Sequence, residues 1–161
     1  MMAGAAGIVA ACSSIDCPVE NTVSCKYELQ KSDGTPDTLN SDTLWVWTPR
    51  PGKTDTLLIN RLCGGSATAF KLPMSYTMPE DTICLMRCDT TDGLWLDTLW
   101  IKKENLPHFE SVDCQAAYFH KITAVRTTHS AIDTLIINNS DVTYENSSTP
   151  THLILRVKAD R

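Results

Sequence analysis

The sequence lacks a surplus of basic residues and has no apolar run long enough to cross a membrane as a helix. Its 14 lysines and arginines are outnumbered by 19 aspartates and glutamates, which gives a formal net charge of -5. Nucleic-acid binding and polybasic membrane binding both require clustered cations. We therefore predict no nucleic-acid partner. A spanning helix is excluded because the N-terminal apolar stretch is far shorter than the required length of about 20 residues.

Sequence motifs for catalysis and cofactor binding are missing as well. There is no Gly-x-Ser-x-Gly, His-Glu-x-x-His, P-loop, dinucleotide fingerprint or Cys-x-x-Cys, so we predict no cofactor and no metal. The densest group of reactive side chains comprises His108, Glu110, Asp113, Cys114 and His120. A hydrolase would need a polar cleft that brings His108, Glu110 and Asp113 together. Their spacing matches no known mechanism, so we predict no catalytic residue and no enzymatic activity.

Long amphipathic helices are also missing, and threonine is abundant. Both features favour strands, because β-branched side chains fit a pleated sheet better than a helix. Nine short apolar runs separated by turn residues are predicted strands: Thr22–Leu29, Asp42–Thr48, Asp55–Arg61, Thr68–Leu72, Asp81–Arg87, Leu94–Lys102, Tyr118–Arg126, Ile132–Asn138 and His152–Lys158. We predict a single all-β domain, an antiparallel immunoglobulin-like β-sandwich, with a closed antiparallel β-barrel as the alternative. The segment Asn105–Gln115 is expected to be irregular because of Pro107, and Cys114–Tyr118 to allow one helical turn.

The N-terminus is short, uncharged and made of small or apolar residues, and it leads into Val9-Ala10-Ala11-Cys12. This pattern is typical of the site at which a bacterial lipoprotein signal peptide is removed and the new terminal cysteine is lipidated. We therefore expect a signal segment (residues 1–11), a tether (12–21) and one β domain (22–161). The expected location is the cell envelope, periplasm-facing or at the cell surface, with the membrane as partner through lipid on Cys12. The alternative is a flexible Ala/Gly-rich terminus with a chance cysteine.

The chain has seven cysteines, an odd number. Lipidation of Cys12 would leave six, an even number that is consistent with disulfides outside the cytoplasm. Cys84 and Cys88 cannot pair if they lie on one strand, because their Cα atoms would be about 13 Å apart. For Cys63, Cys84 and Cys88 the alternative is free, buried thiols.

Trp45 and Trp47 alternate with Leu44 and Val46, so both tryptophans are expected on one face of a strand. Exposed tryptophans could bind a carbohydrate by stacking on sugar rings. Alternatively, the pair is covered by Trp95, Trp100 or a loop, as core aromatic residues usually are.

A short motif recurs along the chain and runs through the predicted strands. Asp-Thr-Leu begins at Asp37, Asp42, Asp55, Asp97 and Asp133, and Asp-Thr-Ile begins at Asp81. Aspartate can bond to the backbone N–H groups of a turn, and threonine then begins the pleated run. The motif is thus expected to mark entry into a strand.

Several stretches together resemble a family of small uncharacterised Bacteroidetes lipoproteins, a domain of unknown function. These stretches are Cys12–Pro18, Leu72–Tyr76 with Pro79–Asp81, Pro107–Cys114, Ala131–Asp133 and Ile137–Asn139. The resemblance implies an envelope location but no activity. It also implies a disulfide between Cys17 and Cys114, and O-glycosylation of threonine in the Asp-Thr motif. The matching acceptors are Thr38, Thr43, Thr56, Thr82, Thr98 and Thr134, with Thr38 expected to be the best.

Taken together, these features predict a lipid-anchored cell-envelope protein with a non-enzymatic binding or scaffolding role. Its partner would be a glycan or another envelope protein. One alternative is a carbohydrate-binding module that uses Trp45 and Trp47. The other is a carrier of lipophilic molecules, which requires the fold to be a closed barrel.

Overall fold

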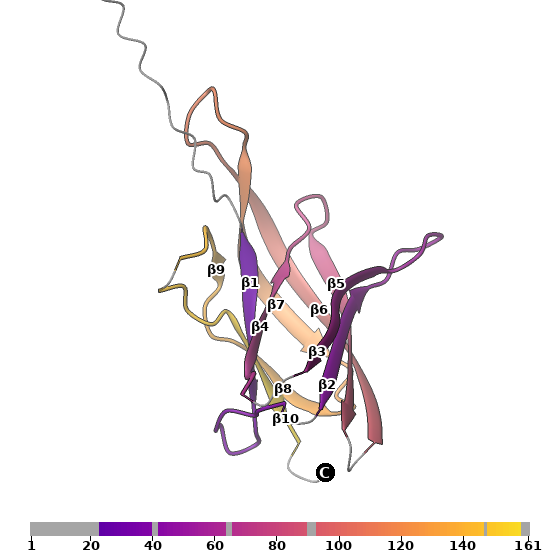
Figure 1. Cartoon of the computed structure of the whole chain (residues 1–161). Helices are drawn as coiled ribbons and strands as arrows, with labels where there is room; N and C mark the ends of the chain where they lie inside the picture. Colours follow the sequence, from indigo (N-terminus) through magenta and orange to yellow (C-terminus); the bar gives the residue numbers. More distant parts are fainter. Residues whose placement is uncertain (1–22, 40–41, 64–65, 90–92, 147, 159–161) are drawn as a thin grey trace, which may run out of the picture.

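The computed structural model describes residues 23–39, 42–63, 66–89, 93–146 and 148–158 (Figure 1). The predicted signal segment, tether, Cys12 and Cys17 lie outside the described residues. The described residues form ten strands: β1 (Ser24–Gln30), β2 (Thr43–Thr48), β3 (Thr56–Cys63), β4 (Ala69–Pro73), β5 (Glu80–Asp89), β6 (Gly93–His108), β7 (Ala117–Thr127), β8 (Ile132–Ile137), β9 (Asp141–Val142) and β10 (Leu153–Val157). All nine predicted strands are found among them, and β9 is additional.

The strands form two sheets that pack against each other. One has the order β4-β1-β10-β8, and the other has the order β3-β2-β5-β6-β7-β9 and curves into half a barrel (Figure 1). The predicted all-β sandwich is confirmed. The closed-barrel alternative is not the fold observed, because each sheet ends in edge strands. The condition for a barrel-type carrier of lipophilic molecules is therefore not met.

Alternation of apolar residues explains how the sheets face each other. In β2 and β5, Leu44, Val46 and Leu85 are fully buried between the sheets. In β1 and β10, Tyr27 and Leu155 supply the opposite layer and are equally buried. Burial of each aliphatic side chain stabilises the fold by about 1.5–3 kcal/mol. The contacts also join strands from both ends of the chain. Among the described residues, no helix is long and apolar enough to cross a membrane.

Two local expectations were wrong. Strand β6 continues through Pro107 to His108, although an irregular path was expected there. Beyond the Glu80–Lys102 pair, β6 is hydrogen-bonded to β7 but no longer to β5. It is therefore an edge at this point, and an edge tolerates a residue without a backbone N–H. Residues 114–116 lie outside helices and strands, and β7 begins at Ala117, so the helical turn does not form.

Asp97, from the recurrent Asp-Thr-Leu motif, holds the β7–β8 turn. Its carboxylate is fully buried, and it accepts hydrogen bonds from the backbone N–H groups of three consecutive residues, Ser130 (2.8 Å), Ala131 (2.8 Å) and Ile132 (3.0 Å). The Thr128 hydroxyl donates a fourth hydrogen bond at 2.7 Å. These bonds satisfy turn N–H groups that would otherwise be buried without a partner.

Two further motif aspartates hold the β1–β2 connection. The Arg87 guanidinium donates to Asp42 and Asp37, with Nε–Oδ2 and Nη1–Oδ2 distances of 2.6 Å. All three side chains are buried. Burial lowers the pKa of Arg87, but hydrogen bonds and charge from the two aspartates outweigh that effect and raise it. The motif is therefore a structural device at these positions.

Candidate functional site

The outer surface of the six-stranded sheet carries an apolar patch. We call it the tryptophan face. It consists of Trp45, Trp47, Leu57, Met86, Leu94, Leu96 and Trp100. Trp45 pairs with Met86, which pairs with Leu96 on the next strand, while Trp47 pairs with Leu57 on the other side. Directly opposed residues project from the same face of a sheet, so these side chains form one surface.

The tryptophan face remains open to solvent. Leu57, Leu94 and Leu96 are 53%, 67% and 48% exposed, and Trp45 and Trp47 are half-buried. Isolated exposed leucines are ordinary, whereas these leucines adjoin two tryptophans in one apolar patch.

The other two tryptophans do not cover this pair. Trp95 pairs with the buried Arg87 and therefore lies on the inner face, with the guanidinium carbon 5.7 Å from its ring centroid. Trp100 belongs to the same face as Trp47 but lies under Arg126, whose guanidinium carbon is 4.4 Å from the ring centroid. The tryptophan pair is thus neither a core cluster nor fully exposed.

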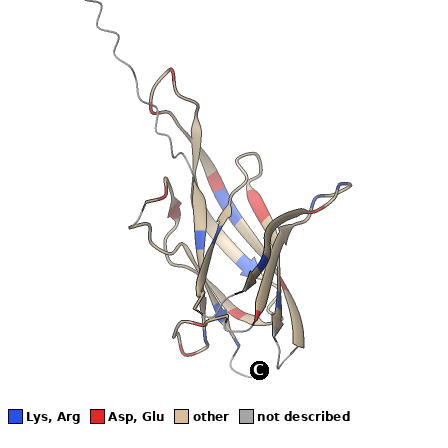
Figure 2. Ribbon diagram, viewed as in Figure 1, with Lys and Arg blue, Asp and Glu red and all other residues tan. Residues whose placement is uncertain are grey.

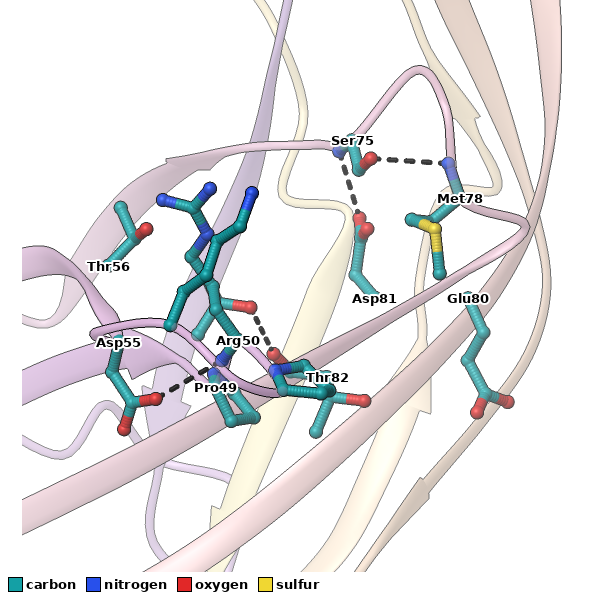
Figure 3. A pocket seen from close by; sticks show the side chains of 12 residues that line it. Pro49, Arg50, Asp55, Thr56, Ser75, Met78, Glu80, Asp81 and Thr82 are labelled. Atoms are coloured by element: carbon teal, nitrogen blue, oxygen red, sulfur yellow. Dashed lines mark hydrogen bonds between the residues drawn. The ribbon is translucent and has the colours of Figure 1, made fainter.

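A second feature is a groove of about 790 Å³ at the open edge between the sheets (Figure 3). We call it the hairpin groove. One wall is the β2–β3 hairpin, with Pro49, Arg50 and Asp55, and the facing wall includes Ser75 and Asp81. A smaller pocket of about 210 Å³ shares Ser75 and Asp81 with the groove.

A buried polar cluster supports the facing wall. The Lys103 side chain is fully buried, and its Nζ lies 3.0 Å from Asp81 Oδ1 and 2.8 Å from the Met78 carbonyl oxygen. Burial raises the pKa of Asp81, although Lys103 opposes that rise. His120 lies 2.8 Å from Asn105, and burial followed by the positive charge of Lys103 lowers the pKa of His120 to about 4. The cluster fixes the β4–β5 loop that forms the wall.

The reactive residues that sequence reasoning considered are split into separate places. His108 and Glu110 form a 3.0 Å pair at the end of β6, and Asp113 is exposed on the following turn. His120 faces the polar cluster instead. Neither the groove nor the smaller pocket is lined by His108, Glu110 or Asp113.

The cysteines also differ in state. Cys25, Cys84 and Cys88 are free thiols; Cys84 is half-buried and Cys88 exposed, so the expectation of buried thiols holds for neither. Cys114 is buried and disulfide-bonded. Its pairing with Cys17 remains a prediction, because Cys17 lies outside the described residues.

The six predicted glycosylation threonines differ in exposure. Only Thr56 is exposed; the others are half-buried: Thr38, Thr43, Thr82, Thr98 and Thr134. The expected best acceptor, Thr38, follows an aspartate that is fixed by Arg87. Accessibility therefore favours Thr56, and glycosylation itself stays a prediction.

The observed geometry defines a β-sandwich domain with an apolar aromatic outer face and a groove at its open edge. The family of unknown function DUF6452 matches residues 43–155, and the chain belongs to this family. No curated protein and no solved structure gives a significant match. The predicted resemblance to a domain of unknown function is thus confirmed. The Bacteroidetes lipoprotein origin stays a prediction.

Sequence reasoning found Trp45 and Trp47 but missed the hairpin groove. The walls of this groove come from the segments 48–56 and 75–82, which the sheet pairing brings together. The Pro49–Gly52 stretch signalled a turn but not what the turn would face. The buried Lys103 had no local signal, since lysine is usually exposed.

Proposed function

We propose that the protein is a lipid-anchored cell-envelope protein with a non-enzymatic binding role, and that the tryptophan face binds another envelope protein. The observation that carries this proposal is the contiguous apolar surface around Trp45 and Trp47, which includes exposed leucines. Tryptophan is enriched among residues that dominate protein interfaces, where surrounding aliphatic side chains exclude water.

Carbohydrate is the second candidate ligand. Trp45 and Trp47 stand two residues apart on one face, which places their Cα atoms about 7 Å apart. Two neighbouring rings on the outer face of the sheet offer a surface on which sugar rings can stack. The half-exposure of both tryptophans leaves this alternative open.

One experiment separates the two candidates. Full-length Trp45→Ala/Trp47→Ala protein and the unaltered protein would be produced in the native host and cross-linked in intact cells. The matched control is Leu106→Ala/Val112→Ala, which removes one exposed apolar group at the far end of β6 and one on the turn that follows it. Loss of a specific protein adduct only in the tryptophan variant supports the proposal. Unchanged adducts, together with tryptophan-dependent binding to an array of envelope glycans, would favour carbohydrate.

The proposed tether rests on the place where the described chain begins. Val23 forms a β-bridge with Tyr144, whose ring lies 5.7 Å from that of His108 at the end of β6. Cys114 lies six positions after His108, and Val23 lies six positions after Cys17, so each segment spans at most about 20 Å. A Cys17–Cys114 bridge is therefore within reach of the chain.

Cys63 is the less suitable partner for Cys114. Its backbone pairs with Thr43, which also pairs with Cys88 at the opposite end of the six-stranded sheet. From that end to His108, β6 extends by about 45 Å. The anchoring proposal is tested by mass spectrometry of protein from the native host. A chain that begins at acylated Cys12 supports it, and an unprocessed N-terminus contradicts it.

A further inference from the structure

We propose that the hairpin groove binds a single-chain anionic amphiphile, with the anionic head at the hairpin and the chain in the pocket between the sheets. This site is separate from the tryptophan face, and it does not depend on the function proposed for that face.

The charges around the groove favour an anion. Arg50 and Lys53 form no ion pair with any described residue. Two acidic groups of the lining are already neutralised: Glu80 lies 3.0 Å from Arg126, and Asp81 lies 3.0 Å from Lys103.

The remaining acid, Asp55, accepts the backbone N–H of Arg50 at 3.1 Å. Two cations therefore oppose one unpaired carboxylate on this wall, which leaves a positive surplus. The projecting hairpin carries both basic and acidic residues near its tip (Figure 2).

The hairpin holds its two cations on one tight turn. The Lys53 N–H donates to the Arg50 carbonyl oxygen at 3.0 Å, and Gly52 has a φ of 71°, which suits glycine. At the base, the Thr48 hydroxyl donates to the Thr82 carbonyl oxygen at 2.8 Å. The wall is therefore preformed, and binding an anion would not require the turn to be built.

The interior of the site is apolar. The smaller pocket has four apolar lining residues, Leu58, Pro73, Met74 and Ile83. Its polar lining residues, Thr48, Ser75 and Asp81, are the ones that it shares with the groove. Figure 3 shows Asp81 and Met78 facing the hairpin residues across the groove. Because Lys103 neutralises Asp81, an alkyl chain can pass this point without meeting an unpaired charge. A ligand with a charged head and an apolar chain therefore matches a site with cations at the hairpin and apolar side chains in the smaller pocket.

The test compares three probes on the full chain by titration calorimetry, below their micelle-forming concentrations. They are decanoate, decyltrimethylammonium with the same chain and the opposite charge, and acetate as the head alone. Decanoate should bind, while the other two should bind at least about tenfold more weakly. Equal binding of the cationic probe would overturn the proposal.

Variants then locate the site. Arg50→Gln/Lys53→Gln should weaken decanoate binding about tenfold, the combined effect of two exposed ion pairs. Lys31→Gln/Lys121→Gln removes the same charge elsewhere on exposed positions and should change little. Equal weakening by both pairs would show general charge attraction and overturn the assignment.

Two further measurements test where the alkyl chain binds and whether the ligand is a free amphiphile or a membrane. Leu58→Trp should fill the smaller pocket and abolish decanoate binding while the circular dichroism spectrum stays unchanged. Retained affinity in a folded Leu58→Trp protein would contradict the placement of the chain. Binding to anionic phospholipid vesicles without binding to free decanoate would overturn the proposal in favour of membrane contact.

Discussion

The substitution Asp97→Asn tests whether the recurrent motif serves the fold. Asparagine has nearly the same size and shape, but one carboxylate oxygen becomes an NH₂ group that donates. Oδ2 of Asp97 accepts from the N–H groups of Ala131 and Ile132. Oδ1 accepts from the Ser130 N–H and from the hydroxyls of Thr128 and, at 3.4 Å, Thr127. Either orientation of the amide therefore places a donor against at least one backbone N–H.

The loss of unfolding free energy is calculated for the orientation of the amide that breaks fewer hydrogen bonds. With NH₂ in place of Oδ1, the Thr128 hydroxyl can rotate and accept, but the Ser130 N–H loses its partner. A buried donor without a partner costs about 1–3 kcal/mol, and the other hydrogen bonds lose the benefit of a charged acceptor, which is about 1 kcal/mol or more in total. We expect the free energy of unfolding to fall by about 3 kcal/mol. For a chain of this size the melting temperature should fall by about 6–12 °C.

The assay is urea unfolding followed by tryptophan fluorescence, with a thermal scan beside it. Asp133→Asn is the matched control, because Asp133 lies in the same Asp-Thr-Leu motif but is exposed, and within the described part of the chain its carboxylate accepts from the neighbouring Thr134 hydroxyl alone. The control should change the unfolding free energy by less than about 0.5 kcal/mol. A loss below about 1 kcal/mol in Asp97→Asn would refute the reasoning.

Three further predictions concern pH, cross-linking and modification. The pKa of His120 is about 4 in the folded protein and about 6.5 when unfolded. The contribution of neutral His120 to the free energy of unfolding is therefore fully present above pH 6.5 and should fall by up to about 3 kcal/mol as the pH drops to 4. Unfolding measured as a function of pH tests this, and an equally steep loss in a folded His120→Asn protein would contradict it. Non-reducing peptide mapping should recover Cys17 linked to Cys114, and Cys114→Ser should cost up to about 4–5 kcal/mol in the chain-entropy estimate; a different partner would refute the pairing. If the native host glycosylates the motif, mass spectrometry should find hexose on the Thr56 peptide and lose it in Thr56→Val, whereas hexose elsewhere would refute the exposure argument.

Several strands were predictable because they bury alternate residues. In β10, for example, Leu153, Leu155 and Val157 are buried while the residues between them are half-buried. Pairing between distant strands has no such local signal. The parallel pairing of β1 with β10 joins Tyr27 to Leu153, and nothing near either residue indicates it. The extension of β6 past Pro107 was missed for a related reason, since proline is tolerated only because that part of β6 is an edge.

The candidate sites also combine features that a local sequence pattern predicts with features that depend on the pairing of distant strands. The tryptophan face was partly predictable, because Trp45 and Trp47 alternate within one strand, but the leucines that complete it come from β3 and β6. The hairpin groove depends on two loops that meet only after the sheet has formed. Its buried Lys103–Asp81 pair is visible only when the register of β5 and β6 is known.

The Asp-Thr motif shows why a frequent motif need not be a functional one. Three of its aspartates, Asp37, Asp42 and Asp97, are buried and bind a turn or an arginine, so the fold explains their presence without any modification. Asp55 accepts the Arg50 N–H within the hairpin, which is again a structural contact. That hairpin, however, presents Thr56 at the surface beside the groove. A modification enzyme needs access to the hydroxyl, so exposure ranks Thr56 first among the six candidate threonines.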